Sequence, residues 1–225
     1  MIYIIPTEKG LGVEIWGTYK DLDNLYLVIG KFWNNTNYLN KKGFESRDKL
    51  ISGFSYEIRK AKEGSRLKRT SSHFTYDQIE YFGTKISWVH FLFSMTSIKY
   101  NMGINEINKF DISMILLLEF WLESAMKKYD EVGAKNLIGF IDGGIYAAND
   151  NIYHFMRCIN MEYFKLKGGK RAFRKLPELL KLGIFNTNEY LEYQKFLTTE
   201  SKRLNCEIIN MEINDDHVDY ENIKW

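Results

Sequence analysis

Residues 108–129 read NKFDISMILLLEFWLESAMKKY, and this stretch decides the fold class of the chain. Within it, Glu119, Glu123 and Lys127 are spaced i, i+4 and i+8, so a helix would place them in one polar stripe. The other faces of that helix are almost wholly apolar, and Gly133 follows as a stop signal. The sequence therefore predicts a long helix that is buried at the centre of the fold.

Two strands are predicted at the N-terminus. Residues 2–5 and 12–19 alternate in side-chain character with the period of two that is typical of a strand. Gly10 and Gly12 supply the turn of a hairpin between them. They do not form a dinucleotide-binding fingerprint, because no third glycine follows three places on and no helix is expected to begin there.

Helical spacing dominates the next part of the chain. Asp21 is the expected N-cap of a helix that runs to about Trp33. A second helix is predicted over residues 48–63, where five apolar side chains fall inside an arc of roughly 100°. These are Leu50, Ile51, Phe54, Ile58 and Ala61. A strand through residues 54–58 is the competing interpretation. Short strands are expected around 66–69 and 79–82, followed by a helix through 88–98.

The last third of the chain is predicted to be mainly helical. Asn149 or Asp150 would cap a helix that runs to about residue 163, and a short basic helix would follow the break at 168–169. Pro177 is expected to begin the next helix, since the first turn tolerates proline. Residues 186–189 resemble a capping box for a helix that ends near 204. Alternation over 209–213 predicts a final strand.

These elements indicate an α+β fold, in which a small N-terminal β-sheet packs on a mainly helical remainder. The chain has 225 residues, of which 45% are apolar and 27% charged, so it can bury a sizeable core. No linker rich in Gly, Ser or Pro separates two units, and residues 1–225 are predicted to form a single domain. Its strand-rich part covers about 1–88, its helical part about 89–205, and its acidic C-terminal segment 206–225.

Membrane, disulfide-bonded and metal-binding proteins are not indicated. The apolar runs 86–95 and 112–122 are shorter than the ~20 residues that span a bilayer, and no signal peptide is recognised. Cys158 and Cys206 lie far apart without a CxxC partner, which is typical of reduced thiols. No two of the four histidines are spaced i, i+3 or i+4, so neither a metal nor another cofactor is predicted. We expect a cytoplasmic protein.

Basic residues are concentrated in two segments, 59–69 and 165–175. The first holds six Lys and Arg residues against one Glu, and the second holds six without an acid, although the whole chain carries only +2. If the segments meet, they would bind a polyanion, a phosphate group or an acidic partner. They could equally be solvated, or pair with the acidic C-terminal segment. The candidate anion- or nucleic-acid-binding residues are Arg59, Lys62, Arg66, Arg69, Lys170, Arg171 and Arg174, with Tyr56 as a candidate for stacking on a base.

Four other residues, Asp142, His154, Arg157 and Asn160, are candidates for chemistry. His154 shares a predicted helix with Cys158, as a thiol nucleophile would require, although a buried structural thiol is the favoured interpretation. Asp142 lies in a glycine-rich turn, where metal-dependent nucleases place carboxylates, but no second acid can be assigned to it. Arg157 and Asn160 share a helix face and suit either an anion or an ion pair between helices.

Three stretches of the chain resemble an uncharacterised bacterial family of unknown function. They are residues 12–22, which begin GVEIWGTY, residues 56–66, which begin YEIRKA, and residues 156–177, which contain MRCIN and GGKRAFRKLP. The resemblance extends over most of the chain. It implies a bacterial cytoplasmic protein that folds as one unit, with a small N-terminal sheet and a helical remainder, and it transfers no catalytic residue.

The sequence leaves more than one function open. Segregated charge and abundant tyrosine favour a non-catalytic binding or interaction protein whose ligand is a nucleic acid, a nucleotide or an acidic protein surface. The alternative is a metal-dependent enzyme acting on phosphodiesters or nucleotides, with Asp142, His154 and the arginines around a phosphate. A subunit of a stress or anti-phage complex is a third hypothesis. A homo-oligomer is also considered.

Overall fold

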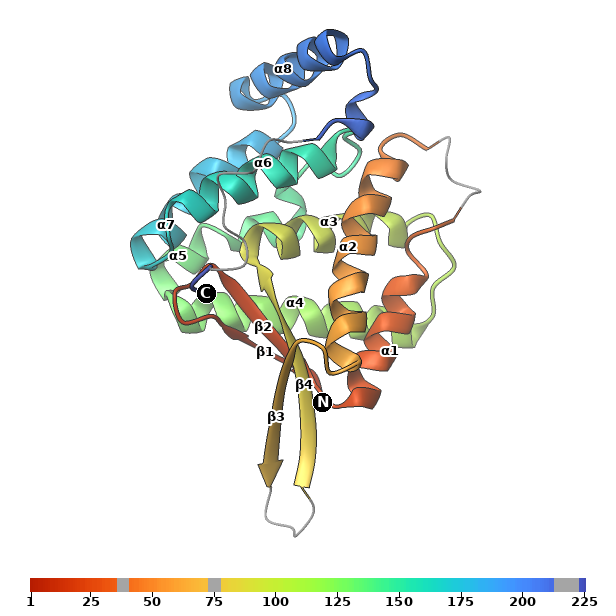
Figure 1. Ribbon diagram of the computed structural model, residues 1–225, viewed down its shortest axis with the longest axis vertical. Helices are drawn as coiled ribbons and strands as arrows, with labels where there is room; N and C mark the ends of the chain where they lie inside the picture. Colours follow the sequence, from red (N-terminus) through yellow and green to blue (C-terminus); the bar gives the residue numbers. More distant parts are fainter. Residues whose placement is uncertain (36–40, 73–77, 213–222) are drawn as a thin grey trace.

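Four strands form one antiparallel sheet in the order β1-β2-β4-β3 (Figure 1). The computed structural model describes residues 1–35, 41–72, 78–212 and 223–225. β1 (Tyr3–Pro6) and β2 (Gly12–Gly17) make the predicted N-terminal hairpin. β3 (Leu67–Ser72) and β4 (Gln78–Ser87) confirm the strands expected near 66–69 and 79–82, but both are longer than predicted. β4 pairs with β2 as well as with β3, so it joins the two hairpins into one sheet.

The two faces of this sheet have different neighbours. Ile4, Ile15 and Thr84 are aligned across β1, β2 and β4, and all three are buried on the side where the Thr84 hydroxyl donates to Glu57 of α2. On the other side the Arg69 guanidinium lies 4.9 Å from the centroid of the Tyr3 ring and 4.6 Å from the Trp16 ring. One face therefore belongs to the helical core, and the other carries a stacked arginine.

The first two helices pack against the core face of the sheet. α1 (Tyr19–Gly30) begins two residues before the predicted N-cap. Thr18 is the cap, and the Asp21 carboxylate accepts from the Thr18 backbone N–H, which completes a capping box. α2 (Phe44–Lys62) confirms the predicted helix, and the competing strand through 54–58 is wrong. Its N-terminus lies at Phe44 rather than near Asp48.

The most deeply buried helix is α3 (Trp88–Met102), in which eleven of the fifteen residues are buried. α4 (Lys109–Tyr129) is the predicted long helix and lies alongside β1, behind the strands in Figure 1. The expectation that α4 forms the buried centre is wrong on one side, because Leu116 and Phe120 are 57% and 59% exposed. An apolar helix face is buried only where a neighbouring element covers it. The centre of the fold is occupied by α3 rather than by α4.

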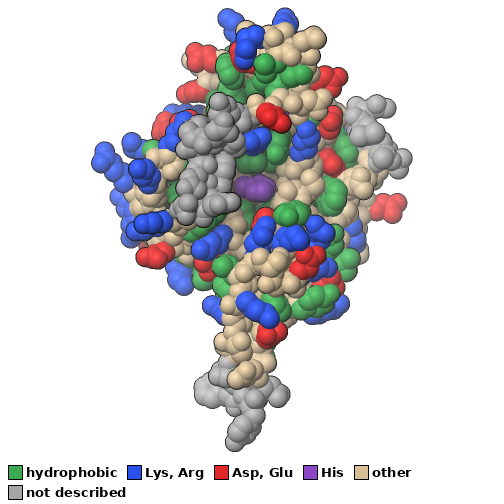
Figure 2. Space-filling model, viewed as in Figure 1, with side chains coloured by type: hydrophobic (Ala, Val, Ile, Leu, Met, Phe, Trp, Pro, Cys, Tyr) green, Lys and Arg blue, Asp and Glu red, His purple; other side chains and the backbone are tan. Residues whose placement is uncertain are grey.

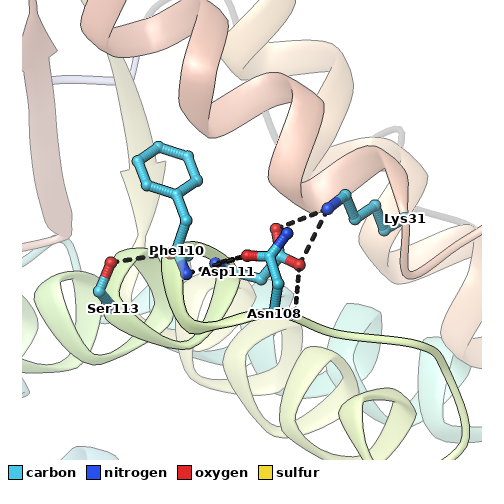
Figure 3. A network of polar contacts seen from close by, with 5 residues as sticks. All are labelled: Lys31, Asn108, Phe110, Asp111 and Ser113. Atoms are coloured by element: carbon cyan, nitrogen blue, oxygen red, sulfur yellow. Dashed lines mark hydrogen bonds and ion pairs between the residues drawn. The ribbon is translucent and has the colours of Figure 1, made fainter.

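A polar network fixes the start of α4 against the end of α1 (Figure 3). The Asn108 side chain accepts from the backbone N–H groups of Phe110 and Asp111, and Asp111 Oδ2 accepts from the Asn108 N–H. Lys31 Nζ lies 2.8 Å and 2.9 Å from the two oxygens of the Asp111 carboxylate. Asp111 is thus both a capping residue and half of an ion pair that joins two helices.

The rest of the chain is helical, with three differences from the predicted boundaries. It contains α5 (Glu131–Lys135), the π-turn Phe140–Gly144, α6 (Ile152–Lys165), α7 (Lys170–Leu180), the 3-10 turn Lys181–Gly183 and α8 (Asn188–Leu204). Pro177 lies inside α7 and does not begin a helix. Asn151 is the N-cap of α6, and Thr187 that of α8.

The structure describes residues 209–212 of the predicted C-terminal strand, and these residues do not form a strand. Ile208–Asn210 form a 3-10 turn, and residues 213–222 of the acidic segment lie outside the described part of the chain. His73 and His217 also fall outside it. The fold class is α+β, as predicted. No helix within the described ranges is long and apolar enough to cross a membrane.

Candidate functional site

The solvent-facing side of α2 separates two pockets that share Gly53 and Tyr56. Leu50, Ile51 and Ile58 face the core, which turns the polar residues of the same helix outward. The first pocket, here called the Arg59 pocket, has a volume of about 550 Å³. The second, here called the His90 pocket, has a volume of about 800 Å³. Both volumes lie in the range of small-molecule binding sites.

The Arg59 pocket combines cations with aromatic rings. It is lined by Tyr26, Trp33, Lys49, Ser52, Gly53, Ser55, Tyr56, Arg59 and Tyr153. The Arg59 guanidinium lies 5.2 Å from the centroid of the Tyr56 ring. Lys49 Nζ lies 5.9 Å from the centroid of the Tyr153 ring and donates to the Ile209 carbonyl. No carboxylate is among these lining residues, so the lining carries the two cations Lys49 and Arg59 and no anion.

Two polar atoms of the Arg59 pocket residues have unused hydrogen-bonding capacity. Trp33 Nε1 and Ser55 Oγ are buried, and neither has a hydrogen-bond partner within the described part of the chain. A buried polar atom without a partner costs free energy, about 1–3 kcal/mol. A ligand or water molecule that reached these atoms would recover part of that cost.

The His90 pocket lies between α2, the base of the β3–β4 hairpin and α6. Arg66 donates twice to Glu57, at 2.8 Å to Oε2 and 3.0 Å to Oε1, and Thr84 donates to the same carboxylate. Burial raises the pKa of Glu57, but these hydrogen bonds outweigh it and lower the pKa overall. Burial also lowers the pKa of His90, so its imidazole is neutral at pH 7. Figure 2 shows this side of the molecule hollowed, with a histidine at the floor of the hollow and Lys and Arg side chains beside it.

One face of α6 supplies the opposite wall of both pockets. Tyr153 lines the Arg59 pocket, whereas Asn160 and Phe164 line the His90 pocket. The buried Oδ1 atom of Asn160 has no hydrogen-bond partner among the described residues. The Phe164 ring meets the Trp225 ring edge-on, with centroids 5.9 Å apart. The Arg157 guanidinium lies 5.9 Å from the Tyr153 ring, on the same face of α6.

The candidate residues of the first basic segment are distributed over three places. Arg59 and Arg66 line the two pockets together with Tyr56. Lys62 forms an ion pair with Asp23, at 2.8 Å. Arg69 stacks on the outer face of the sheet. The structure thus brings Arg59, Arg66, Tyr56 and Asn160 together, and leaves Lys62 and Arg69 outside the described pockets.

The second basic segment does not reach this site. Lys170, Arg171 and Arg174 lie on α7, which Figure 1 places at the side of the molecule, away from the β3–β4 hairpin. Arg174 donates to both oxygens of Asp130, at 2.6 Å and 2.9 Å. The Gly169 N–H at the start of α7 donates to the Lys9 carbonyl. None of the pockets described for this structure has a residue of 165–175 in its lining.

The residues proposed for catalysis lie in surroundings that do not suit that role. Asp142 is 68% exposed on the π-turn, where its nearest cation is Lys99 at 4.0 Å. His154 is buried and its Nε2 lies 3.1 Å from the Met211 carbonyl. Burial raises the pKa of Cys158, the opposite of what a thiolate nucleophile needs. Within the described ranges, no three His, Cys, Asp or Glu side chains are grouped so as to hold a metal ion.

Three of the site residues, Lys49, Gly53 and Tyr153, carried no signal that we interpreted from the sequence. Lys49, Gly53 and Tyr56 recur at i, i+4 and i+7 on α2, and Tyr153, Arg157, Asn160 and Phe164 recur at i, i+4, i+7 and i+11 on α6. Each stripe could have been identified as the non-core face of its helix. That the two stripes face the same pockets depends on tertiary packing, which periodicity does not contain.

The chain is thus an α+β protein with a small antiparallel sheet, a helical remainder and two pockets between α2 and α6, whose linings include Lys, Arg and aromatic side chains. Residues 2–225 match a family described as a domain of unknown function (DUF6904), and the chain belongs to that family. The resemblance to a family of unknown function is thereby confirmed. No curated protein and no solved structure matches the sequence.

Proposed function

We propose that the protein is a non-catalytic binding protein, and that its ligand is an anion with a planar group, namely a nucleotide or a single-stranded nucleic acid. The observation that carries this proposal is the lining of the Arg59 pocket, which unites two cations and four aromatic rings without a carboxylate. A phosphate would pair with Lys49 and Arg59, and a base would stack on a ring such as Tyr56 or Tyr153.

The energetics favour a ligand that uses both kinds of contact. Stacking of a base on an aromatic side chain is worth about 1–3 kcal/mol, and guanidinium–phosphate hydrogen bonds add affinity and orientation. Tyr56 is 44% exposed, so its ring is available at the boundary of the two pockets. A multivalent anion without a planar group would use only the cations, and we expect it to bind more weakly.

Isothermal titration calorimetry with ATP, tripolyphosphate and a short single-stranded RNA tests the proposal. We expect ATP and RNA to bind more tightly than tripolyphosphate, and binding to weaken as salt is raised from about 50 to 200 mM. Arg59→Ala should weaken ATP binding by about tenfold, that is ~1.4 kcal/mol.

The matched control is Arg171→Ala, an exposed arginine on α7 that lines no described pocket. Its affinity for ATP should equal that of the wild type. Absence of binding at low salt would refute the proposed function. An equal loss of ATP affinity in both variants would show that the binding site does not lie on α2.

We also propose that the protein is bacterial and acts in the cytoplasm, on the basis of the family resemblance and the spacing of its two cysteines. Cell fractionation with an antibody against the chain tests this location, and recovery in a secreted or envelope fraction would contradict it.

A further inference from the structure

One face of α4 exposes a line of large apolar side chains. Ile112, Leu116 and Phe120 follow one another at i, i+4 and i+8, and they are 38%, 57% and 59% exposed. Single exposed apolar residues are ordinary on a protein surface. Three on one line of a long helix, held in place by the Asn108–Asp111–Lys31 network of Figure 3, form a surface that a second helix can cover.

Charged residues continue this line at both ends with opposite signs. Lys109 lies seven residues before Leu116, and Glu123 lies seven residues after it. Seven residues are close to two full turns, so both charges share the face of Leu116. Each lies about 10.5 Å along the helix axis from Leu116, at 1.5 Å per residue.

We infer that this face binds α4 of a second copy of the chain, antiparallel, about a two-fold axis that passes near Leu116. This arrangement places Leu116 against Leu116 and each Ile112 against the Phe120 of the other copy. It also places each Lys109 opposite the Glu123 of the other copy, which makes two identical ion pairs. Such reciprocal pairing is what an isologous interface requires.

The charges select this partner and this orientation. A parallel pairing would set Lys109 against Lys109 and Glu123 against Glu123, and like charges in contact are destabilising. An antiparallel pairing also opposes the two helix dipoles favourably. The intramolecular contact of Glu123 with Lys127, at 3.2 Å, is compatible with this arrangement because both side chains remain at the surface.

Sedimentation velocity over a range of concentrations, with the full chain, tests the inference. The expected particle has twice the 26.7 kDa mass of one chain. Leu116→Glu should weaken the dimer by about tenfold or more, because it places two carboxylates on the two-fold axis. The matched control is Leu191→Glu on α8, a leucine that is 48% exposed, which should leave the dimer unchanged. Circular dichroism establishes that both variants are folded.

Charge-reversal variants distinguish this interface from other possible dimer interfaces. Lys109→Glu alone and Glu123→Lys alone should each weaken the dimer, because each creates two like-charge contacts. The double variant Lys109→Glu/Glu123→Lys should restore it. A monomer at all concentrations would overturn the inference, and so would a dimer that is insensitive to Leu116→Glu or a double variant no tighter than the singles. None of these outcomes depends on the ligand of the Arg59 pocket.

Discussion

Asp111 shows how one buried carboxylate can stabilise two elements at once. It closes the capping box of α4 and forms an ion pair with Lys31 at the end of α1. Burial raises its pKa, but hydrogen bonds from Lys31 and the Asn108 backbone outweigh burial and lower the pKa below the ordinary value of 3.8. The charged form is therefore the one that the folded state prefers.

Asp111→Asn should lower the free energy of unfolding at pH 7 by about 1–3 kcal/mol, since it removes the ion pair and weakens the cap. Because the pKa is lower in the folded state, this stabilisation is complete above the unfolded-state pKa and is lost as pH falls through the folded-state pKa. The deficit of the variant should thus begin to shrink as pH falls towards 3.8, and should shrink further below it as Asp111 becomes protonated in the folded state.

Thermal unfolding of both proteins between pH 7 and pH 3 measures the effect. The control is Glu162→Gln, which removes the exposed ion pair between Glu162 and Lys165 on α6. We expect it to change the free energy of unfolding by less than about 0.5 kcal/mol. A deficit for Asp111→Asn that stays constant across this pH range would contradict the account.

At the scale of the element, α2 contains a glycine where the helix does not require one. Gly53 lies in the helix interior, and a Cβ atom added there would lie 3.7 Å from Cε1 and Nε2 of His90, an ordinary van der Waals contact. Gly53→Ala should therefore raise the free energy of unfolding by about 0.5–1 kcal/mol. Urea denaturation measures the change.

The control for this substitution is Gly83→Ala in β4. A Cβ atom at Gly83 would lie 2.7 Å from Trp16 Cδ2 and 2.8 Å from the Ile15 carbonyl oxygen, closer than real contacts allow. The same change should thus destabilise the sheet. If Gly53→Ala lowered stability as Gly83→Ala does, Gly53 would have a packing role that the distances do not show.

Elements with one clear apolar stripe were predictable from the sequence, and their surroundings were not. α2 follows from the spacing of Leu50, Phe54 and Ile58, whereas its N-terminus was predicted at residue 48 and lies at Phe44. Pro177 was misplaced because an interior proline is costly, yet α7 contains it. Periodicity identifies apolar faces but not which of them has a neighbour, so the exposure of Leu116 could not be predicted.

The candidate site was predictable only in part for the same reason. Arg59, Arg66 and Tyr56 belong to a basic segment that composition identifies, but α6 joins them through contacts about a hundred residues apart in sequence. The second basic segment has the same number of Lys and Arg residues but lies elsewhere. Charge density along a chain therefore indicates candidate surfaces, and the packing of helices determines which of them combine.

For the whole molecule, burial is distributed unevenly between α3 and α8. Eleven of the fifteen residues of α3 are buried, whereas only Tyr190 and Leu197 are buried in the seventeen-residue α8. Figure 1 shows α8 projecting beyond α6 at one end of the molecule. Segments with few buried contacts open locally at a lower free energy than the core.

We therefore expect the backbone amides of α8 to exchange with solvent through local opening, and those of α3 only through global unfolding. Hydrogen exchange measured by mass spectrometry at increasing urea concentration distinguishes the two, since only global opening depends steeply on denaturant. Leu197→Ala should accelerate exchange in α8 more than in α3, because it removes one of the two buried anchors of α8. Equal opening free energies for α3 and α8, in the wild type and in this variant, would show that α8 unfolds together with the core despite its small buried surface.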